Sequence, residues 1–414
     1  MRKITVDVLF LIITLFLSVH CLQAQDKEPQ ISPARMEARK QLGELGVPYN
    51  KESFVKQAAE GDTIAVKLFL DSGMNPNVYT SMGQEYETAL LAAIRNVQPE
   101  TAQLLLAEGA NIEIIDSDRT SALMVAARTN QPTIVRLLLA RNANINFTNA
   151  FGSNALFEAA KAHSDESVRL LIAKGADIHD DRPGRGDSTF LMVASRDLST
   201  DTVRLILDKG LDVNAISADG HTALMSAASA GKTSTIKLLL DKGADINART
   251  SANATALMLA AAYAGPDAVK LLLDKGADID VTGYIDQFTG PPLSHAVRHR
   301  KLDNVKVLIS RKVDVNSANK DGATPLSLAL QDGNSEIIEA LSAAGVNVNA
   351  PLPNGDTPLI VAVKLGNPDV IALLIRLGAN VNAENSKGVT ALKEAREYHR
   401  LDIVKILQSA GARN

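Results

Sequence analysis

The chain has 414 residues and a formal net charge of −4. A slightly acidic chain lacks the basic excess of a protein that binds nucleic acid along its length, so we expect no nucleic-acid partner. Alanine and leucine are abundant, aromatic residues are scarce and tryptophan is absent, which favours small, closely packed helices.

The first 24 residues are typical of an export signal. Arg2 and Lys3 form a short basic start, Val8 to Val19 is largely apolar, and a polar stretch ends at Ala24. An apolar core this short fits a signal peptide better than a membrane span. We therefore predict a signal peptide over residues 1–24, cleavage after Ala24, and export to the periplasm or the outside of the cell.

The single cysteine, Cys21, lies inside this segment. A mature chain without thiols suits an oxidising compartment and needs no disulfides there. The alternative is a lipid on Cys21 that would tether the protein to a membrane. His20 stands where such lipid-attachment signals carry a small residue, which favours simple cleavage. Membrane contact is thus expected only through a retained or lipidated signal.

A polar lead-in over residues 25–49 separates the signal from the rest of the chain. Within it, Pro33 to Gly46 is charged and suits a short helix. From residue 50 to residue 414 one pattern continues without a linker, so we predict a single repeat domain there.

The repeat is marked by a glycine that follows a leucine-rich segment. Successive markers are 33 to 36 residues apart, which is typical of stacked two-helix units. The glycines are Gly73, Gly109, Gly175, Gly210, Gly243, Gly276, Gly345, Gly378 and Gly411, and Asn142 and Lys312 take the two positions without glycine. Eleven markers predict about eleven repeats in one extended array, instead of the two or three domains that the length suggests.

The sixth repeat shows how one unit is built. Gly220 permits a tight turn, and the Thr222 hydroxyl is placed to cap the first helix. Gly231 ends that helix, and a second one is expected over residues 233–241, ending before Gly243. So small a unit cannot bury its own apolar surface, so neighbouring repeats must provide the stability.

The tripeptides Thr324-Pro325-Leu326 and Thr357-Pro358-Leu359, each followed by a segment of the type AxLLxxGAxxNA, resemble the ankyrin repeat. The resemblance covers residues 51–414 and implies an all-α ankyrin-repeat solenoid of stacked helix-turn-helix units with β-turn fingers. It also implies a protein-binding module without a cofactor.

The family's histidine after threonine-proline-leucine is absent throughout, and apolar packing is expected to replace its hydrogen bonds in most repeats. In its place stand Leu91, Met124, Phe157, Met192, Met225, Met258, Ser294, Ser327, Ile360 and Lys393. Lys393 and Glu394 are polar where inner repeats are apolar, so we predict that they form the outer face of a terminal repeat.

By the same resemblance, the eighth residue of each TALM-like segment lines a concave groove. In repeats two to five this residue is basic, namely Arg95, Arg128, Lys161 and Arg196. Four basic residues in succession predict a protein partner with an acidic surface. The alternative is an ordinary solvated surface, where charged residues are common. Later repeats carry Ser229, Ala262, Arg298, Gln331, Lys364 and Glu397.

Aromatic residues are concentrated in the predicted fingers, where exposed rings on a rigid scaffold are favoured interface anchors. The alternative is packing against the neighbouring finger. The residues are Tyr79, Tyr86, Phe147, Phe151, Tyr284 and Phe288.

No pattern predicts catalysis or a metal site. His295 and His299 are four residues apart on one predicted helix, but two ligands do not make a site, and we expect both to be ordinary, partly exposed histidines.

Arg185-Gly186-Asp187 spells an integrin-recognition tripeptide in a stretch of turn-forming residues, and we interpret it as a turn. With no nucleophile–base pair or phosphate loop, we predict no enzyme activity and no small-molecule substrate. The alternative to a specific binding module is a structural or self-associating protein of the cell envelope.

Overall fold

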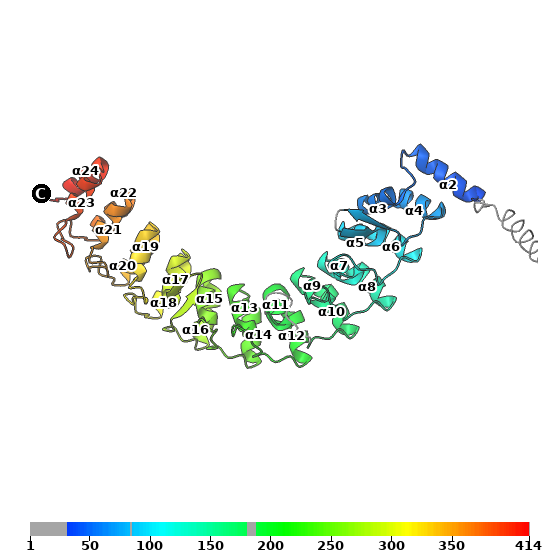
Figure 1. Ribbon diagram of the computed structural model, residues 1–414. Coiled ribbons are helices and arrows are strands. Elements are labelled where there is room, and N and C mark those ends of the chain that lie inside the picture. Colours follow the sequence, from blue (N-terminus) through cyan, green and yellow to red (C-terminus); the bar gives the residue numbers. More distant parts are fainter. Residues whose placement is uncertain (1–30, 83–84, 180–187, 414) are drawn as a thin grey trace, which may run out of the picture. The chain divides into compact units, whose positions relative to one another are not determined.

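The computed structural model describes residues 31–82, 85–179 and 188–413 and divides into two compact units, residues 1–144 and 145–414. Each unit is a row of antiparallel helix pairs (Figure 1). The predicted array of two-helix repeats is confirmed, since eleven such pairs follow one another along the described part of the chain.

Unit 1 holds a lead-in helix, three helix pairs and one hairpin. These elements are α2 (Pro33–Glu44), α3 (Lys51–Glu60), α4 (Thr63–Asp71), β1 (Tyr79–Met82), β2 (Glu85–Thr88), α5 (Ala89–Arg95), α6 (Pro99–Ala107), α7 (Ala122–Arg128) and α8 (Pro132–Ala140).

Unit 2 holds eight helix pairs and a second hairpin. Its elements are α9 (Ala155–Lys161), α10 (Asp165–Ala173), α11 (Phe190–Asp197), α12 (Thr200–Asp208), α13 (Ala223–Ser229), α14 (Thr233–Asp241), α15 (Ala256–Tyr263), α16 (Pro266–Asp274), β3 (Gly283–Ile285), β4 (Phe288–Gly290), α17 (Pro292–Arg298), α18 (Leu302–Ser310), α19 (Pro325–Gln331), α20 (Ser335–Ala343), α21 (Pro358–Leu365), α22 (Pro368–Arg376), α23 (Ala391–Glu397) and α24 (Leu401–Ser409).

A side-chain cap begins the first helix in ten of the eleven repeats, as the sequence predicts, and Pro291 at the start of α17 is the exception. The Thr222 hydroxyl accepts a hydrogen bond of 3.2 Å from the Met225 N–H, and Ser121 and Thr255 act in the same way on α7 and α15. A cap of this kind stabilises a helix by about 1 kcal/mol, a sizeable share for a helix of two turns.

The first helices lie in an inner row and the second helices in an outer row within unit 2 (Figure 1). The inner helices are buried on nearly all sides, as Ala223 to Ala228 in α13 show. Small alanines allow neighbouring inner helices to approach closely, so the core runs along the row from one repeat to the next. The outer helices bury only one face, and Lys237 of α14 is exposed.

The positions of the missing family histidine are mostly apolar and buried, as predicted. Met124, Met225 and Ile360 are fully buried in the core. Ser327 is an exception, because its hydroxyl accepts the Thr324 N–H at 2.9 Å and donates to the Thr324 carbonyl at 2.8 Å. A small hydroxyl there replaces part of the hydrogen bonding that apolar side chains cannot supply.

Two repeat-closing positions lack glycine and still adopt the left-handed conformation. Asn142 has φ +63° and Lys312 has φ +60°. A non-glycine residue there costs about 1 kcal/mol, and asparagine costs less because it visits this region more readily. Lys312 therefore makes the end of α18 a strained point of unit 2.

The two ends of the array differ in how they are closed. Helix α2 packs on α4 and buries Leu42, which confirms the short helix predicted in the lead-in. At the other end Lys393 is exposed as predicted, but Glu394 is 8% exposed and faces Lys364. The expectation that Glu394 belongs to the outer face is wrong, because its carboxylate pairs with the preceding repeat.

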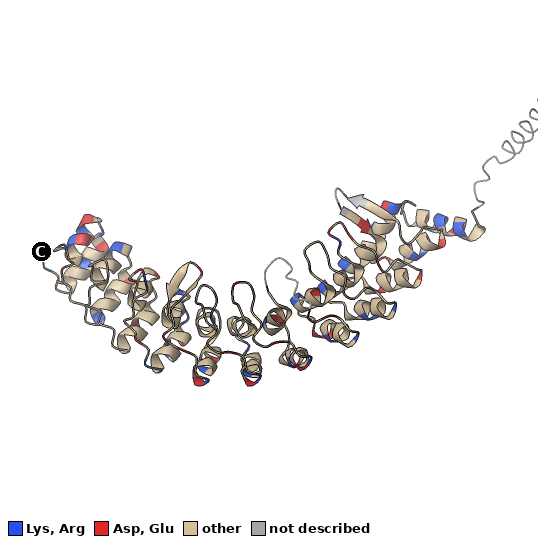
Figure 2. Ribbon diagram, turned by 60° about the horizontal axis from the view of Figure 1, so that its bottom comes forward, with Lys and Arg blue, Asp and Glu red and all other residues tan. Residues whose placement is uncertain are grey.

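Charged residues of both signs lie along the outer helices of unit 2 (Figure 2). Asp208 accepts from Lys242 at 2.8 Å, and Asp241 lies 3.9 Å from Lys275. Exposed pairs of this kind contribute at most about 1 kcal/mol each. They join neighbouring outer helices, which share less apolar contact than the inner ones.

None of the described helices is both long and apolar enough to cross a bilayer.

Candidate protein-interaction surface

The predicted concave positions lie at or next to the C-terminal ends of the inner helices. Arg95, Arg128 and Lys161 are the last residues of α5, α7 and α9, and Arg196 is the penultimate residue of α11. A basic side chain at a helix C-terminus interacts favourably with the backbone dipole. This local effect explains part of the preference for basic residues here without any partner.

Arg95 is held by carboxylates of its own unit. Its guanidinium donates to Glu87 on β2 and, at 2.9 Å, to Asp116 in the loop before α7. The side chains of Glu87 and Asp116 are 14% and 10% exposed, so both acids depend on Arg95 for compensation. Arg95 is thus a structural cation whose charge is largely cancelled.

Arg196 is also compensated. Its guanidinium donates two hydrogen bonds to the neighbouring Asp197, at 3.0 and 2.8 Å. Those bonds raise the pKa of Arg196 above its usual value despite partial burial. An incoming acidic group would therefore compete with Asp197 for this arginine.

Arg128 and Lys161 differ from these two. Both side chains are exposed, and neither forms an ion pair with another residue of the described ranges. Arg128 borders a small polar hollow of about 140 Å³ that Asp116, Ser117 and Asp118 also line. Of the four basic residues in repeats two to five, Arg128 in unit 1 and Lys161 in unit 2 are therefore the two that no described acid compensates. Arg298, at the same position in the eighth repeat, is also exposed and lies 5.9 Å from the Phe288 ring.

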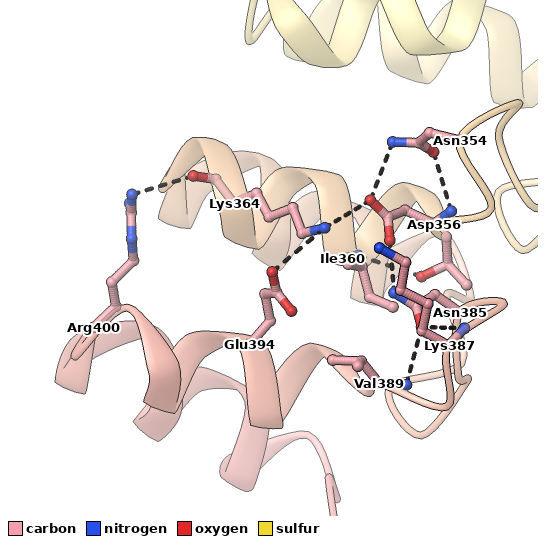
Figure 3. A network of polar contacts seen from close by, with 10 residues as sticks. Asn354, Asp356, Ile360, Lys364, Asn385, Lys387, Val389, Glu394 and Arg400 are labelled. Atoms are coloured by element: carbon pink, nitrogen blue, oxygen red, sulfur yellow. Dashed lines mark hydrogen bonds and ion pairs between the residues drawn. The ribbon is translucent and has the colours of Figure 1, made fainter.

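In the tenth repeat the predicted concave position is Lys364, and this lysine belongs to a network of polar contacts (Figure 3). Lys364 at the end of α21 donates to Asp356 at 2.8 Å and lies 3.4 Å from Glu394 on α23. Asn385 donates to the other carboxylate oxygen of Asp356 at 2.7 Å. Asn354 donates at 3.1 Å to the same Asp356 oxygen as Lys364. Burial raises the pKa of Asp356, but the hydrogen bonds from Lys364 and Asn385 outweigh it, so the net pKa is lowered.

The hairpin of unit 1 presents two tyrosines. Tyr79 and Tyr86 are 58% and 56% exposed, and their rings meet edge to face at 5.8 Å. The antiparallel register pairs Tyr79 with Thr88 and Ser81 with Tyr86, which places both rings on one face of the ribbon. The Lys51 ammonium lies 5.9 Å from the Tyr79 ring. This pair satisfies the prediction of exposed aromatic residues in a finger.

The hairpin of unit 2 meets that prediction only in part. Tyr284 is 47% exposed, but Phe288 is 9% exposed and packs edge to face on His295 at 5.3 Å. Phe288 is therefore a core residue of the hairpin and no exposed anchor, because β4 turns it towards α17. In the turn before α9, Phe151 is exposed and Phe147 is half-buried.

One aromatic residue of the surface, Tyr263, was not among the residues predicted from the sequence. Tyr263 ends α15, is partly exposed, and donates its hydroxyl to Asp286 at the tip of the β3–β4 hairpin. Burial and that hydrogen bond raise the pKa of the Tyr263 phenol. The ring also lies edge to face on His299 at 5.1 Å. The only sequence signal was its position next to the concave residue Ala262.

His295 of α17 and His299, which follows the last residue of that helix, do not share an environment. His295 is fully buried, and its Nε2 lies 3.2 Å from the Gly283 carbonyl, so the expectation of partial exposure is wrong for it. It occupies the place that Leu259 and Leu328 take in neighbouring repeats, and burial lowers its pKa. His299 is partly exposed and lies 3.8 Å from Asp286. Across the described ranges, no three histidine, cysteine or acidic residues gather as a metal site would require.

Three predictions fall outside the described residues: the tripeptide Arg185-Gly186-Asp187, cleavage after Ala24, and the lipid alternative at Cys21. They remain predictions from the sequence.

Comparison with known proteins identifies the class. The family described as "Ankyrin repeats (3 copies)" matches residues 55–149, 142–217, 191–283, 283–351 and 344–414, and the chain belongs to this family. Ankyrin repeats generally mediate protein–protein interaction and typically serve as binding scaffolds, not as enzymes. No curated protein matches the chain.

Among solved structures, the chain is similar to the crystal structure of the human ASB11 ankyrin repeat domain. The two are 24% identical, the match covers 54% of this chain and 98% of that chain, and the TM-score is 0.48.

Proposed function

We propose that this ankyrin-repeat chain is a scaffold that binds an acidic protein partner, with Arg128 as a cationic contact of unit 1 and Lys161 as a separate cationic contact of unit 2. The observation that carries the proposal is that these two side chains are exposed and have no ion-pair partner among the described residues. The acids beside Arg95 and Arg196 already compensate those two arginines.

The exposed tyrosines of the hairpins serve as anchors in this proposal. Tyr79, Tyr86 and Tyr284 stand on short two-stranded ribbons that adjoin rigid helix pairs. Tyrosine buries a large area and loses little conformational freedom on binding, which is why it is frequent among residues that dominate binding energy. A pre-formed scaffold also loses little entropy on association.

Charge reversal tests the cationic contacts. The variant Arg128→Glu/Lys161→Glu is compared with Lys237→Glu/Lys270→Glu, which makes the same change in net charge on the exposed outer face of α14 and α16. Both are used to capture partners from an envelope extract at low salt, where electrostatic attraction is strongest.

The proposal expects an acidic protein that the wild-type chain and the outer-face variant capture and that the Arg128/Lys161 variant loses. Equal capture by both variants would contradict the cationic contacts. Capture of nothing but the chain itself would favour the self-associating alternative.

We further propose that the chain works in the cell envelope after export. The basic start, the apolar stretch over residues 8–19 and the polar end at Ala24 support this. Mass spectrometry of the protein from cells expressing the full chain should give an N-terminus at Gln25. An intact N-terminus in the cytoplasmic fraction would overturn the proposal, and a lipid mass on Cys21 would replace cleavage after Ala24 by membrane anchoring.

A further inference from the structure

At six junctions between neighbouring repeats, an asparagine in the loop after the outer helix joins the two repeats. Its side-chain oxygen accepts the backbone N–H of a residue in the corresponding loop of the next repeat, at 2.7 to 3.0 Å. We call this contact the asparagine clamp. Its members are Asn77, Asn146, Asn214, Asn247, Asn349 and Asn382.

In three clamps the amide holds the next loop at two points. Asn349 accepts the Asn380 N–H at 2.7 Å and donates to the Gly378 carbonyl at 3.0 Å. Asn214 and Asn382 repeat this arrangement on the carbonyls of Gly243 and Gly411. The clamp is thus a site that recognises a short stretch of extended backbone through one donor and one acceptor.

Asn316 occupies the same place in the repeat but does not form the clamp. In the clamps at Asn349 and Asn382, the asparagine accepts the N–H of the residue 31 positions later. For Asn316 that residue is Asn347. Within the described ranges, the Asn316 side chain is exposed and makes no hydrogen bond. The Asn316 amide can therefore bind backbone, but the loop at Asn347 does not occupy it.

A pocket opens at this junction. It has a volume of about 350 Å³ and is lined by the aliphatic side chains of Val315, Leu326, Val346 and Leu352, with Asn316 among its polar residues. Pockets that hold ligands begin at about 300 Å³ and combine apolar walls with a few polar groups that fix orientation. This pocket has both features.

The wall contributed by the ninth repeat is uncharged. Residues 345–355, from Gly345 to Gly355, contain no acidic or basic side chain. A charged group entering the pocket would lose its hydration without gaining an ion pair. The chemistry of the walls therefore selects an uncharged occupant, in contrast to the cationic contacts at Arg128 and Lys161.

We propose that this pocket binds an extended, uncharged peptide segment of a partner protein. The Asn316 amide takes one N–H and one carbonyl of the segment, as Asn349 does with the loop at Gly378, and an aliphatic side chain fills the space between Val315 and Leu352. The site lies in the loops that follow α18 and α20 and at the start of α19, so it is separate from the residues of the proposed function and is tested independently of them.

The probe comes from the chain itself. A blocked peptide with the sequence of residues 377–383, Leu-Gly-Ala-Asn-Val-Asn-Ala, carries the backbone that Asn349 binds and has no charge. The matched control peptide has aspartate in place of both asparagines. Binding to the full chain is followed by methyl NMR with labelled valine and leucine, which places reporters at Val315, Leu326, Val346 and Leu352.

The proposal expects saturable shifts of these four methyl groups with the uncharged peptide and none with the aspartate peptide. Asn316→Ala should weaken binding about tenfold, as expected for the loss of two backbone hydrogen bonds. Asn316→Asp, which keeps an acceptor but loses the donor, should also weaken binding. Val315→Phe, which fills the pocket, should abolish it.

Several results would overturn the proposal. These are the absence of methyl shifts at millimolar peptide, equal affinity in Asn316→Ala, or shifts confined to residues outside the pocket. Asn316 is exposed and makes no hydrogen bond among the described residues, so its replacement should leave the thermal unfolding midpoint unchanged. An unchanged midpoint assigns any lost binding to the missing amide.

Discussion

Replacing Lys364 by methionine should loosen the last two repeats. The lysine compensates two buried acids, Asp356 and Glu394, whose side chains are 7% and 10% exposed. Methionine keeps the length of the side chain and removes the charge, so both carboxylates lose a donor that they cannot replace with full hydration.

The magnitude follows from the contacts. A hydrogen bond to a charged group contributes about 1.5 to 3 kcal/mol. Lys364 makes one short contact of 2.8 Å and one of 3.4 Å, and its own side chain is 35% exposed, so solvent screens part of the interaction. We expect a loss of about 2 kcal/mol in the local opening free energy, which speeds amide exchange about 30-fold.

Hydrogen exchange over α21 to α24 at pH 7 measures the effect, with exposed Lys393→Met as the control that should change little.

The pH dependence gives a second check. The pKa of Asp356 is lowered below 3.8 in the folded chain, so its stabilisation is present above that pH and disappears as the pH falls through the folded value. The difference between wild type and variant should therefore shrink below pH 3.8. Equal exchange of wild type and variant at pH 7, or a difference in exchange that stays the same at pH 3, would contradict the compensation of Asp356 and Glu394 by Lys364.

Three further predictions concern single positions. Arg95→Ala should destabilise unit 1 by about 2 kcal/mol in urea unfolding, because Glu87 and Asp116 lose their cation, and a change below about 0.5 kcal/mol would contradict this. Burial lowers the pKa of His295, so the unfolded chain binds more protons below pH 6.5 and wild type should lose stability from pH 7 to pH 5. His295→Leu should flatten that slope in thermal melts, and an unchanged slope counts against it. Lys312→Gly should raise stability by up to about 1 kcal/mol by relieving the left-handed backbone, whereas a lower melting temperature would argue against strain.

The repeat architecture was predictable because it depends on local signals that recur. Thr222 as a helix cap and Gly243 as a helix end are each encoded within a few residues, and the 33-residue spacing then fixes the stacking. Even the strained Lys312 could be found, since it breaks a pattern set by nine glycines.

The state of the surface charges was not predictable in the same way. Arg95 and Arg128 occupy the same repeat position, yet only Arg95 pairs with two half-buried acids, because Glu87 and Asp116 belong to segments whose approach depends on the fold. Phe288 likewise looked like an exposed finger residue until the register of β3 and β4 placed it against His295. Pairing across segments, and not residue type, decides which side chains remain available.

The sequence also does not show which asparagines form the clamp. Its sequence signature is regular, and Asn316 carries it as fully as Asn349 does. Only the structure shows that one clamp is open and that aliphatic side chains line the space beside it.

The proposed function requires that the partner contacts the inner helices near Lys161 and not the outer helices. Site-specific photocrosslinking tests it most directly, with a photoreactive phenylalanine derivative placed at position 161 in one protein and at position 237 in another. We expect a crosslinked partner from position 161 and none from position 237. A crosslink from position 237 alone would place the binding surface on the outer helices and contradict it.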